Sequence, residues 1–229
     1  MKMRLFCKGF GTYGVRRLVG KAAIGLFLSA APALADPVRI LAFGDSLTQG
    51  YGLIADEGFV PQLDAWLDEN GAEATVVNGG VSGDTTAGGA ARVDWSLTPD
   101  IDAMIVTLGG NDMLRGLDPA EARKNLAAIL DSAAAQDLPV LLVGMTAPGN
   151  FGPDYKASFD AIYPDLADTY NTLYFRDFFA GLGAGDPASL QPYFQPDGIH
   201  PNAEGVEKIV AALGPKVLKL IAAAKGQGS

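Results

Sequence analysis

Short runs of mostly apolar residues recur along the chain and predict buried β-strands. They cover residues 38–43, 75–77, 103–108 and 140–143, and a weaker run covers residues 172–175. The runs do not alternate between apolar and polar positions, which is expected where helices cover both faces of a sheet. Glycine-rich segments follow the first three runs, so we expect each of those strands to end in a turn.

Between these runs, apolar residues recur at helical spacing. The clearest helix begins at Asp118, a good N-cap, with Pro119 at the first helical position and Glu121 in the first turn. One face of this helix carries Leu126, Ile129, Leu130 and Ala133. Similar patterns predict helices over residues 60–69, 86–93, 155–170 and 203–224.

Alternating strands and helices define an α/β fold with a parallel sheet and right-handed crossovers. We predict a single domain over residues 36–229, a flavodoxin-like three-layer sandwich whose five-stranded parallel sheet has the order 2-1-3-4-5. In that order a ligand crevice opens at the carboxyl ends of strands 1 and 3. Ser46 follows the first strand, Gly80 the second and Asn111 the third. The topology therefore brings these three residues to one edge of the sheet.

The first 35 residues differ in composition from the rest. They carry six basic residues and no acidic one, followed by a short apolar stretch over residues 22–28 and the small-residue end Ala33-Leu34-Ala35. This pattern is typical of a cleavable signal peptide, and the apolar stretch is too short for a membrane anchor. We predict cleavage between Ala35 and Asp36 and export to a bacterial periplasm. Arg16-Arg17 leaves the twin-arginine route open beside the general one.

Without that segment the chain keeps 11 basic and 26 acidic residues, a formal charge of −15. Such a charge disfavours nucleic acid and anionic membrane surfaces as partners. Cys7, the only cysteine, leaves with the signal, and one histidine cannot build a histidine-based zinc site. We therefore expect no cofactor and no metal, although a calcium ion held by oxygen atoms alone stays open. We further expect a monomer without stable membrane insertion, acting on a small-molecule substrate.

His200 is the only histidine and stands three residues after Asp197. Its imidazole can accept and return a proton near neutrality, and Asp197 can fix the tautomer of that ring. Ser46 lies at the turn that leaves the first strand, where an exposed hydroxyl activated by a base becomes a nucleophile. Taken singly, His200 also fits a solvated loop residue, and Ser46 also fits a helix N-cap. The segment around Ser46 lacks the second glycine of the nucleophile elbow, so the sequence does not favour the α/β-hydrolase fold.

A serine nucleophile also needs hydrogen-bond donors for the oxyanion. The backbone N–H of Gly80 and the side-chain amide of Asn111 are the candidates, although both glycine-rich segments also fit ordinary turns. Apolar side chains in the neighbouring loops are candidates for substrate binding, with core packing as the alternative for each. These candidates are Tyr51, Met113, Leu114, Phe151, Tyr193 and Phe194.

Together, these segments resemble the SGNH (GDSL) hydrolase superfamily over nearly the whole of residues 36–229. The matching motifs are Gly-Asp-Ser-Leu at 44–47, Val-Asn-Gly-Gly at 77–80, Gly-Gly-Asn-Asp at 109–112 and Asp-Gly-Ile-His-Pro at 197–201. The resemblance implies the SGNH hydrolase fold, a Ser46-His200-Asp197 triad, and an oxyanion hole made by Ser46, Gly80 and Asn111.

Within the superfamily the chain looks like the bacterial thioesterase I, lysophospholipase and arylesterase group. The segments at 50–52, 82–86, 111–116 and 161–164 carry this likeness, whereas residues 178–193 match nothing in it. The likeness implies hydrolysis of acyl or aryl esters, with acyl thioesters and lysophospholipids as further substrates. A carbohydrate O-acetylesterase and a non-catalytic flavodoxin-like binding module are the alternatives.

Overall fold

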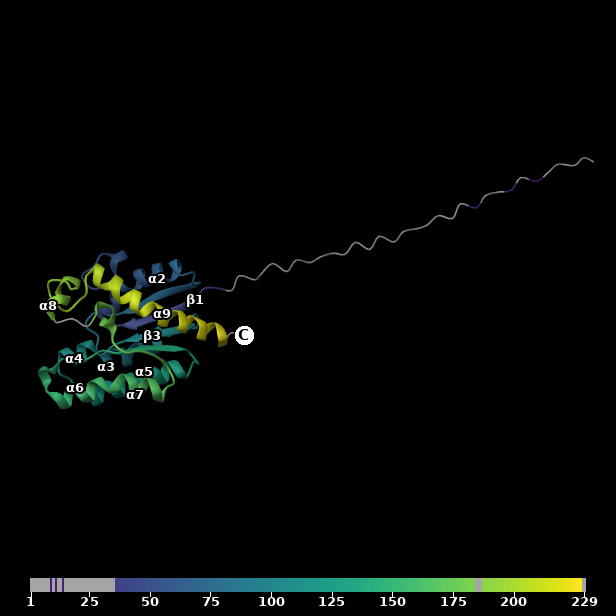
Figure 1. The fold of residues 1–229 in the computed structure, drawn as a ribbon. Helices are drawn as coiled ribbons and strands as arrows, with labels where there is room; N and C mark the ends of the chain where they lie inside the picture. Colours follow the sequence, from purple (N-terminus) through teal and green to yellow (C-terminus); the bar gives the residue numbers. More distant parts are fainter. Residues whose placement is uncertain (1–8, 10, 12–13, 15–35, 184–186, 228–229) are drawn as a thin grey trace, which may run out of the picture. The chain divides into compact units, whose positions relative to one another are not determined.

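The computed structural model describes residues 36–183 and 187–227, together with the isolated glycines Gly9, Gly11 and Gly14. The predicted signal peptide, residues 1–35, lies outside the described residues apart from those three glycines. The body of the chain, Asp36–Ser229, is one compact unit. Its fold is drawn in Figure 1.

The sheet has five parallel strands in the order β2-β1-β3-β4-β5. They are β1 (Val38–Gly44), β2 (Ala74–Gly80), β3 (Ala103–Thr107), β4 (Val140–Val143) and β5 (Leu173–Phe175). The predicted α/β class and strand order are confirmed. Every residue of β3 and of β4 is buried, as expected for strands covered on both faces.

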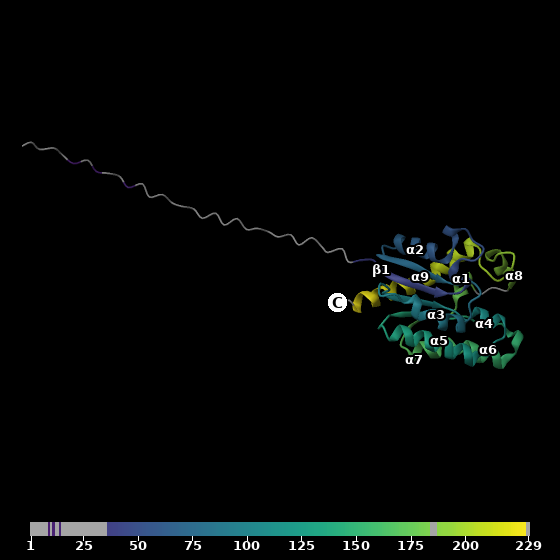
Figure 2. The same ribbon diagram turned by 180° about the vertical axis from the view of Figure 1, so that it is seen from behind.

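Helices cover the two faces of the sheet in separate layers, as Figures 1 and 2 show from opposite sides. One layer consists of α2 (Phe59–Glu69) and α9 (Ala203–Gln227). The other consists of α3 (Thr86–Ser96), α5 (Pro119–Ala134), α6 (Pro153–Asp160) and α7 (Ile162–Thr169). In α5 the predicted apolar face is buried at Leu126, Ile129, Leu130 and Ala133.

Several short elements, not predicted from the sequence, follow the strands. They are α1 (Ser46–Gln49), η1 (Ala55–Glu57), α4 (Gly110–Leu114), η2 (Gly149–Phe151), η3 (Phe178–Leu182), α8 (Pro187–Leu190) and η4 (Gln191–Tyr193). In both views α4 and α8 lie at the same end of the molecule, beyond the carboxyl ends of the strands. These elements shape the edge at which the sequence placed the candidate residues.

Two predicted elements differ from those observed. The helix expected over residues 155–170 is two helices, α6 and α7, which meet at Ala161. Pro164 lies in the first turn of α7, where its missing N–H costs no intrahelical bond; in one continuous helix it would remove one. The second strand is longer than expected, because β2 stays in register with β1 up to the pair Gly44 and Gly80.

Across the part of the chain that the structure describes, no helix is both long enough and apolar enough to cross a membrane.

Leu126 offers a test of the core. Its side chain is fully buried in the layer that covers β1 and β3. Replacing it with alanine is expected to lower the free energy of unfolding by about 2 to 5 kcal/mol, since the cavity would be only partly filled. Trp95→Ala is the matched control, because that side chain is 88% exposed and its removal should cost about 0.5 kcal/mol or less. Urea denaturation followed by circular dichroism measures both; equal losses would contradict this description of the core.

Candidate active site

The serine of the site lies directly after β1, at the start of α1. Asp45 is the N-cap of this short helix, and its Oδ1 accepts a hydrogen bond from the Leu47 backbone N–H (3.0 Å). Ser46 is the first helical residue, so its own N–H has no acceptor within the helix. Gly50, with a φ of 87°, ends the helix in the left-handed conformation that glycine adopts without strain. The local sequence therefore exposes both the hydroxyl and the N–H of Ser46.

Ser46, His200 and Asp197 form one line of hydrogen bonds. The Oγ of Ser46 is 2.9 Å from Nε2 of His200, and Nδ1 of His200 is 2.7 Å from Oδ2 of Asp197. The other oxygen of Asp197 accepts the backbone N–H groups of Ile199 and His200. The hydrogen bond with His200, followed by those two N–H groups, lowers the pKa of Asp197 to about 2. Asp197 is therefore a carboxylate at any pH near neutrality.

Gln195 holds the loop of His200 against the loop that follows α1. Its backbone N–H donates to the His200 carbonyl (2.8 Å). Its side-chain amide donates to the carbonyls of Tyr51 (2.8 Å) and Pro201 (3.0 Å). The ring of Tyr51 packs against the imidazole, with 4.6 Å between ring centroids. Two segments far apart in the sequence are thus joined beside the serine–histidine pair.

The Asp45 carboxyl lies beneath the site and is only 1% exposed. Burial raises its pKa to about 6, although the Leu47 N–H, the nearby His200 and the Asn111 amide each lower it. The carboxylate of Asp84 raises it further. The protonation of Asp45 therefore changes within the ordinary working range of pH.

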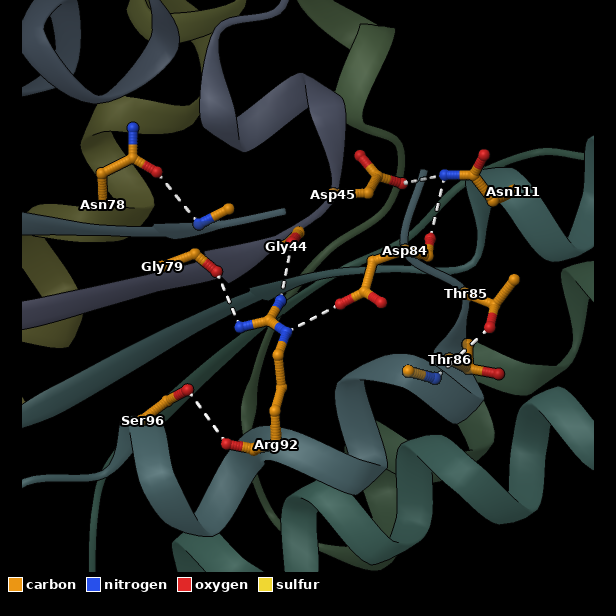
Figure 3. Close-up of polar contacts among 12 residues, drawn as sticks. Gly44, Asp45, Asn78, Gly79, Asp84, Thr85, Thr86, Arg92, Ser96 and Asn111 are labelled. Carbon is orange, nitrogen blue, oxygen red and sulfur yellow. Dashed lines mark hydrogen bonds and ion pairs between the residues drawn. The ribbon is translucent and has the colours of Figure 1, made fainter. Parts of the chain in front are cut away.

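Asn111 lies in the first turn of α4 and lines the same pocket as Ser46 and His200. Its side-chain nitrogen donates to the backbone carbonyl of Asp84 (2.9 Å) and lies 3.4 Å from Oδ2 of Asp45, as Figure 3 shows. The amide is therefore held between the loops that follow β1 and β2. The predicted convergence of Ser46 and Asn111 is observed.

The prediction for Gly80 is wrong. Its N–H donates to Oδ1 of Asn78 (2.9 Å), and its Cα faces α1 so closely that an added Cβ would overlap the backbone of Gln49. Neither Gly80 nor Gly83 is among the residues that line the pocket, so the hydrogen bond of the Gly80 N–H is the deciding observation. The physical reason is that Gly80 still belongs to the sheet, and even Val81 donates its N–H to the Gly44 carbonyl.

Gly83, which the sequence reasoning did not single out, has the properties sought at Gly80. Its φ of 82° lies in the left-handed region, and nothing within 4 Å would meet an added Cβ. Within the described residues, the N–H of Gly83 has no protein acceptor. It directly precedes Asp84, whose carbonyl binds the Asn111 amide. The sequence carried no signal that separates Gly83 from Gly80, because the positive φ is seen only in the structure.

A pocket of about 430 Å³ opens beside Ser46 and His200. Of the six predicted substrate-binding residues, Met113, Leu114 and Phe194 line it. Side chains that the sequence reasoning missed complete its apolar wall: Leu47, Met145, Phe179 and Ile199. Phe179 lies in residues 178–193, which match nothing in the family group, so no local pattern indicated that it lines the pocket.

The other three predicted substrate-binding residues do not line the pocket. Tyr51 packs on the His200 ring. Phe151 packs against Tyr155, with 5.1 Å between ring centroids, and lies over Gly116. Tyr193 faces the ammonium group of Lys208 on α9, at 4.9 Å from its ring centroid. Their rings are therefore engaged by other parts of the protein.

A serine, a histidine and an aspartate aligned beside a pocket are the arrangement of serine hydrolases, and on this fold they define the SGNH class. The chain belongs to the GDSL-like lipase/acylhydrolase family, whose model matches residues 42–208.

Relatives and solved structures agree with this assignment. Esterase TesA of Pseudomonas aeruginosa is 35% identical over 208 residues, covering 90% of this chain and all of that protein. Thioesterase 1/protease 1/lysophospholipase L1 of Escherichia coli is 35% identical over 78% of this chain and 82% of that protein. The crystal structure of AlinE4, an SGNH-hydrolase family esterase, is 43% identical and superposes with a TM-score of 0.67, covering 82% of this chain and 98% of that one.

The raised pKa of Asp45 predicts a pH dependence of stability. Its folded pKa of about 6 exceeds the unfolded value of about 3.9, so the folded state binds the extra proton between these values. The contribution of Asp45 to stability is therefore present below about pH 4 and is lost as the pH rises toward 6. Two pKa units correspond to roughly 3 kcal/mol.

Urea denaturation of the wild type and Asp45→Asn at pH 4, 5, 6 and 7 measures this. The advantage of the wild type over the variant should shrink from pH 4 to pH 6 and then level off. Trp95→Ala, a change at an exposed residue that does not titrate, is the control and should leave the difference constant with pH. A constant difference for Asp45→Asn as well would refute the raised pKa.

Proposed function

We propose that this chain is a serine esterase that hydrolyses acyl or aryl esters through an acyl-enzyme. In this proposal Ser46 is the nucleophile, His200 the general base and acid, and Asp197 the residue that orients the imidazole. The unbroken line of hydrogen bonds from Ser46 through His200 to Asp197, at 2.9 and 2.7 Å, is the observation that carries it.

The reaction follows from that line. His200 takes the proton of the Ser46 hydroxyl as the oxygen attacks the acyl carbonyl, and then gives it to the departing alcohol. Water, activated in the same way by His200, releases the acid from the acyl-enzyme. Asp197 stays ionised throughout, because its pKa is held at about 2. It therefore stabilises the imidazolium in each half of the reaction.

Three N–H donors are available for the oxyanion in this mechanism. They are the backbone N–H groups of Ser46 and Gly83 and the second N–H of the Asn111 amide. The first two have no acceptor within the described protein. The amide donates to the Asp84 carbonyl at 2.9 Å and has only the longer contact of 3.4 Å to Asp45 Oδ2, which the oxyanion would replace. Donors already in place at a developing negative charge are a large source of catalysis.

The composition of the pocket favours acyl substrates. Met113, Leu114, Met145, Phe179, Phe194 and Ile199 form its walls, whereas polar groups gather at the serine. An acetylated sugar needs more polar partners than this wall provides, so a carbohydrate O-acetylesterase fits less well. The names of the relatives, esterase, arylesterase and thioesterase/lysophospholipase, support acyl esters first and add acyl thioesters and lysophospholipids as candidate substrates.

We also propose that residues 1–35 direct export to a bacterial periplasm and are cleaved after Ala35. The basic start, the short apolar stretch and the small residues before Asp36 support this. The mature enzyme would then meet esters outside the cytoplasm.

Hydrolysis of a matched set of substrates tests the proposed function. We expect activity on octanoyl and palmitoyl p-nitrophenyl esters to exceed that on acetylated xylose. An octanoyl thioester and a lysophosphatidylcholine are included to rank the other substrate classes. Ser46→Ala should abolish all activity, with Ser158→Ala, a change at an exposed serine of α6, as control. A preference for the acetylated sugar would favour the O-acetylesterase; full activity in Ser46→Ala would refute a serine mechanism.

Asn111→Ala tests the oxyanion hole separately from the nucleophile. Loss of one donor is expected to lower kcat by about 100- to 1000-fold while KM changes little, because the donor acts on charge that develops only in the transition state. Steady-state kinetics on p-nitrophenyl octanoate measures both constants. An unchanged kcat would remove Asn111 from this role.

A further inference from the structure

Arg92 lies behind the candidate oxyanion hole and uses each nitrogen of its guanidinium group. Its Nε pairs with Oδ2 of Asp84 (2.7 Å), its Nη1 donates to the Gly79 carbonyl (3.0 Å), and its Nη2 donates to the Gly44 carbonyl (2.9 Å). Figure 3 shows the side chain reaching from α3 to these three acceptors. The planar group also stacks on Phe43, 4.0 Å from the ring centroid.

Two of these three acceptors, at Gly44 and Asp84, belong to segments that carry the candidate donors. Gly44 stands two residues before Ser46, at the end of β1. Asp84 directly follows Gly83, and its own carbonyl receives the Asn111 amide. One side chain from α3 therefore connects to the positions of Ser46, Gly83 and Asn111, which come from three different loops.

The Asp84 side chain is closely packed and mostly buried where it pairs with Arg92. Its carboxylate lies against Gly88, where an added Cβ would overlap Oδ1. The side chains of Arg92 and Asp84 are only 22% and 14% exposed, so each is partly withdrawn from water and depends on the other for compensation. Arg92 also places a positive charge beside Asp84, the carboxylate that raises the pKa of buried Asp45.

We propose that Arg92 is a positioning residue that fixes the oxyanion hole. It does not contact the substrate: it holds the Gly44 carbonyl and the Asp84 side chain, and through them the N–H groups of Ser46, Gly83 and Asn111. This inference rests on the proposed esterase function. It requires the shape of a guanidinium group and not only its charge, since an ammonium group cannot reach three acceptors with the same planar fork.

Arg92→Lys tests this role, because it keeps the charge and shortens the reach. We expect kcat on p-nitrophenyl octanoate to fall by about 10- to 100-fold while KM stays within about threefold, since small misplacement of donors affects the transition state most. Arg39→Lys is the matched control: Arg39 pairs with Asp100 near the opposite end of β1 and should tolerate the change. Titration with a fluorophosphonate normalises each rate to folded, reactive enzyme.

A purely structural role for Arg92 predicts different results. It predicts a lower melting temperature with kcat per titrated site within about twofold of the wild type, and that result would overturn the proposal. Asp84→Asn provides a second variant if Arg92→Lys folds poorly. It keeps the backbone carbonyl that binds Asn111 but weakens the ion pair, so kcat per site should fall about 3- to 10-fold; no fall would also overturn the proposal.

The double variant Arg92→Lys/Asn111→Ala asks whether Arg92 acts through the oxyanion hole. Residues that act through one another are not additive, so Arg92→Lys should lower kcat by a smaller factor in the Asn111→Ala background than in the wild type. Full multiplication of the two factors would overturn the proposal. Failure of the esterase function itself is distinguishable, because the wild type would then neither react with the fluorophosphonate nor hydrolyse the ester.

Discussion

The hydrogen bond between Ser46 Oγ and His200 Nε2 is the contact on which the rest of the site depends, because it joins residues 154 positions apart in the chain. Parallel strands make that possible, since their carboxyl ends meet at one edge of the sheet and each loop that leaves them starts there. The segment that follows β5 carries His200 to that edge, just before α9 begins at Ala203. Gln195 completes the closure by tying the loop of His200 to that of Tyr51. The fold thus brings Ser46 and His200 within hydrogen-bonding distance, and local hydrogen bonds orient their side chains.

Behind that contact lies a second layer of charged groups in a region with little water. Asp45, Asp84 and Arg92 are all partly or fully buried: Asp45 and Arg92 bind backbone groups, and the Asp84 carboxylate pairs with Arg92. A buried polar network of this kind is costly unless it is complete, so it specifies one arrangement of the loops. Burial raises the pKa of Asp45 to about 6. The pKa of Asp197, which is more exposed, falls instead to about 2, because His200 and two backbone N–H groups bind its carboxylate.

The sequence predicted the sheet order and the convergence of Ser46 and Asn111, because buried strands and helix caps leave strong local patterns. The place of His200 beside Ser46 was implied by the family resemblance. The sequence did not single out Gly83, the glycine after β2 that we propose as a donor. Gly80 and Gly83 look alike in sequence, and only the strand register shows that Gly80 still belongs to the sheet. It also missed Met145 and Phe179, whose place in the pocket depends on packing between distant segments. The split between α6 and α7 had one usable signal, Pro164, whose position in a first turn was not recognised.

Locating the covalent adduct of a fluorophosphonate tests the central claim most directly. The reagent needs a serine oxygen activated by a base and a site that accepts a developing negative charge on phosphorus-bound oxygen. Peptide mapping by mass spectrometry should place a single adduct on Ser46, and His200→Gln should slow its formation by at least about 1000-fold. An adduct on another residue, or labelling of His200→Gln at the rate of the wild type, would contradict the account.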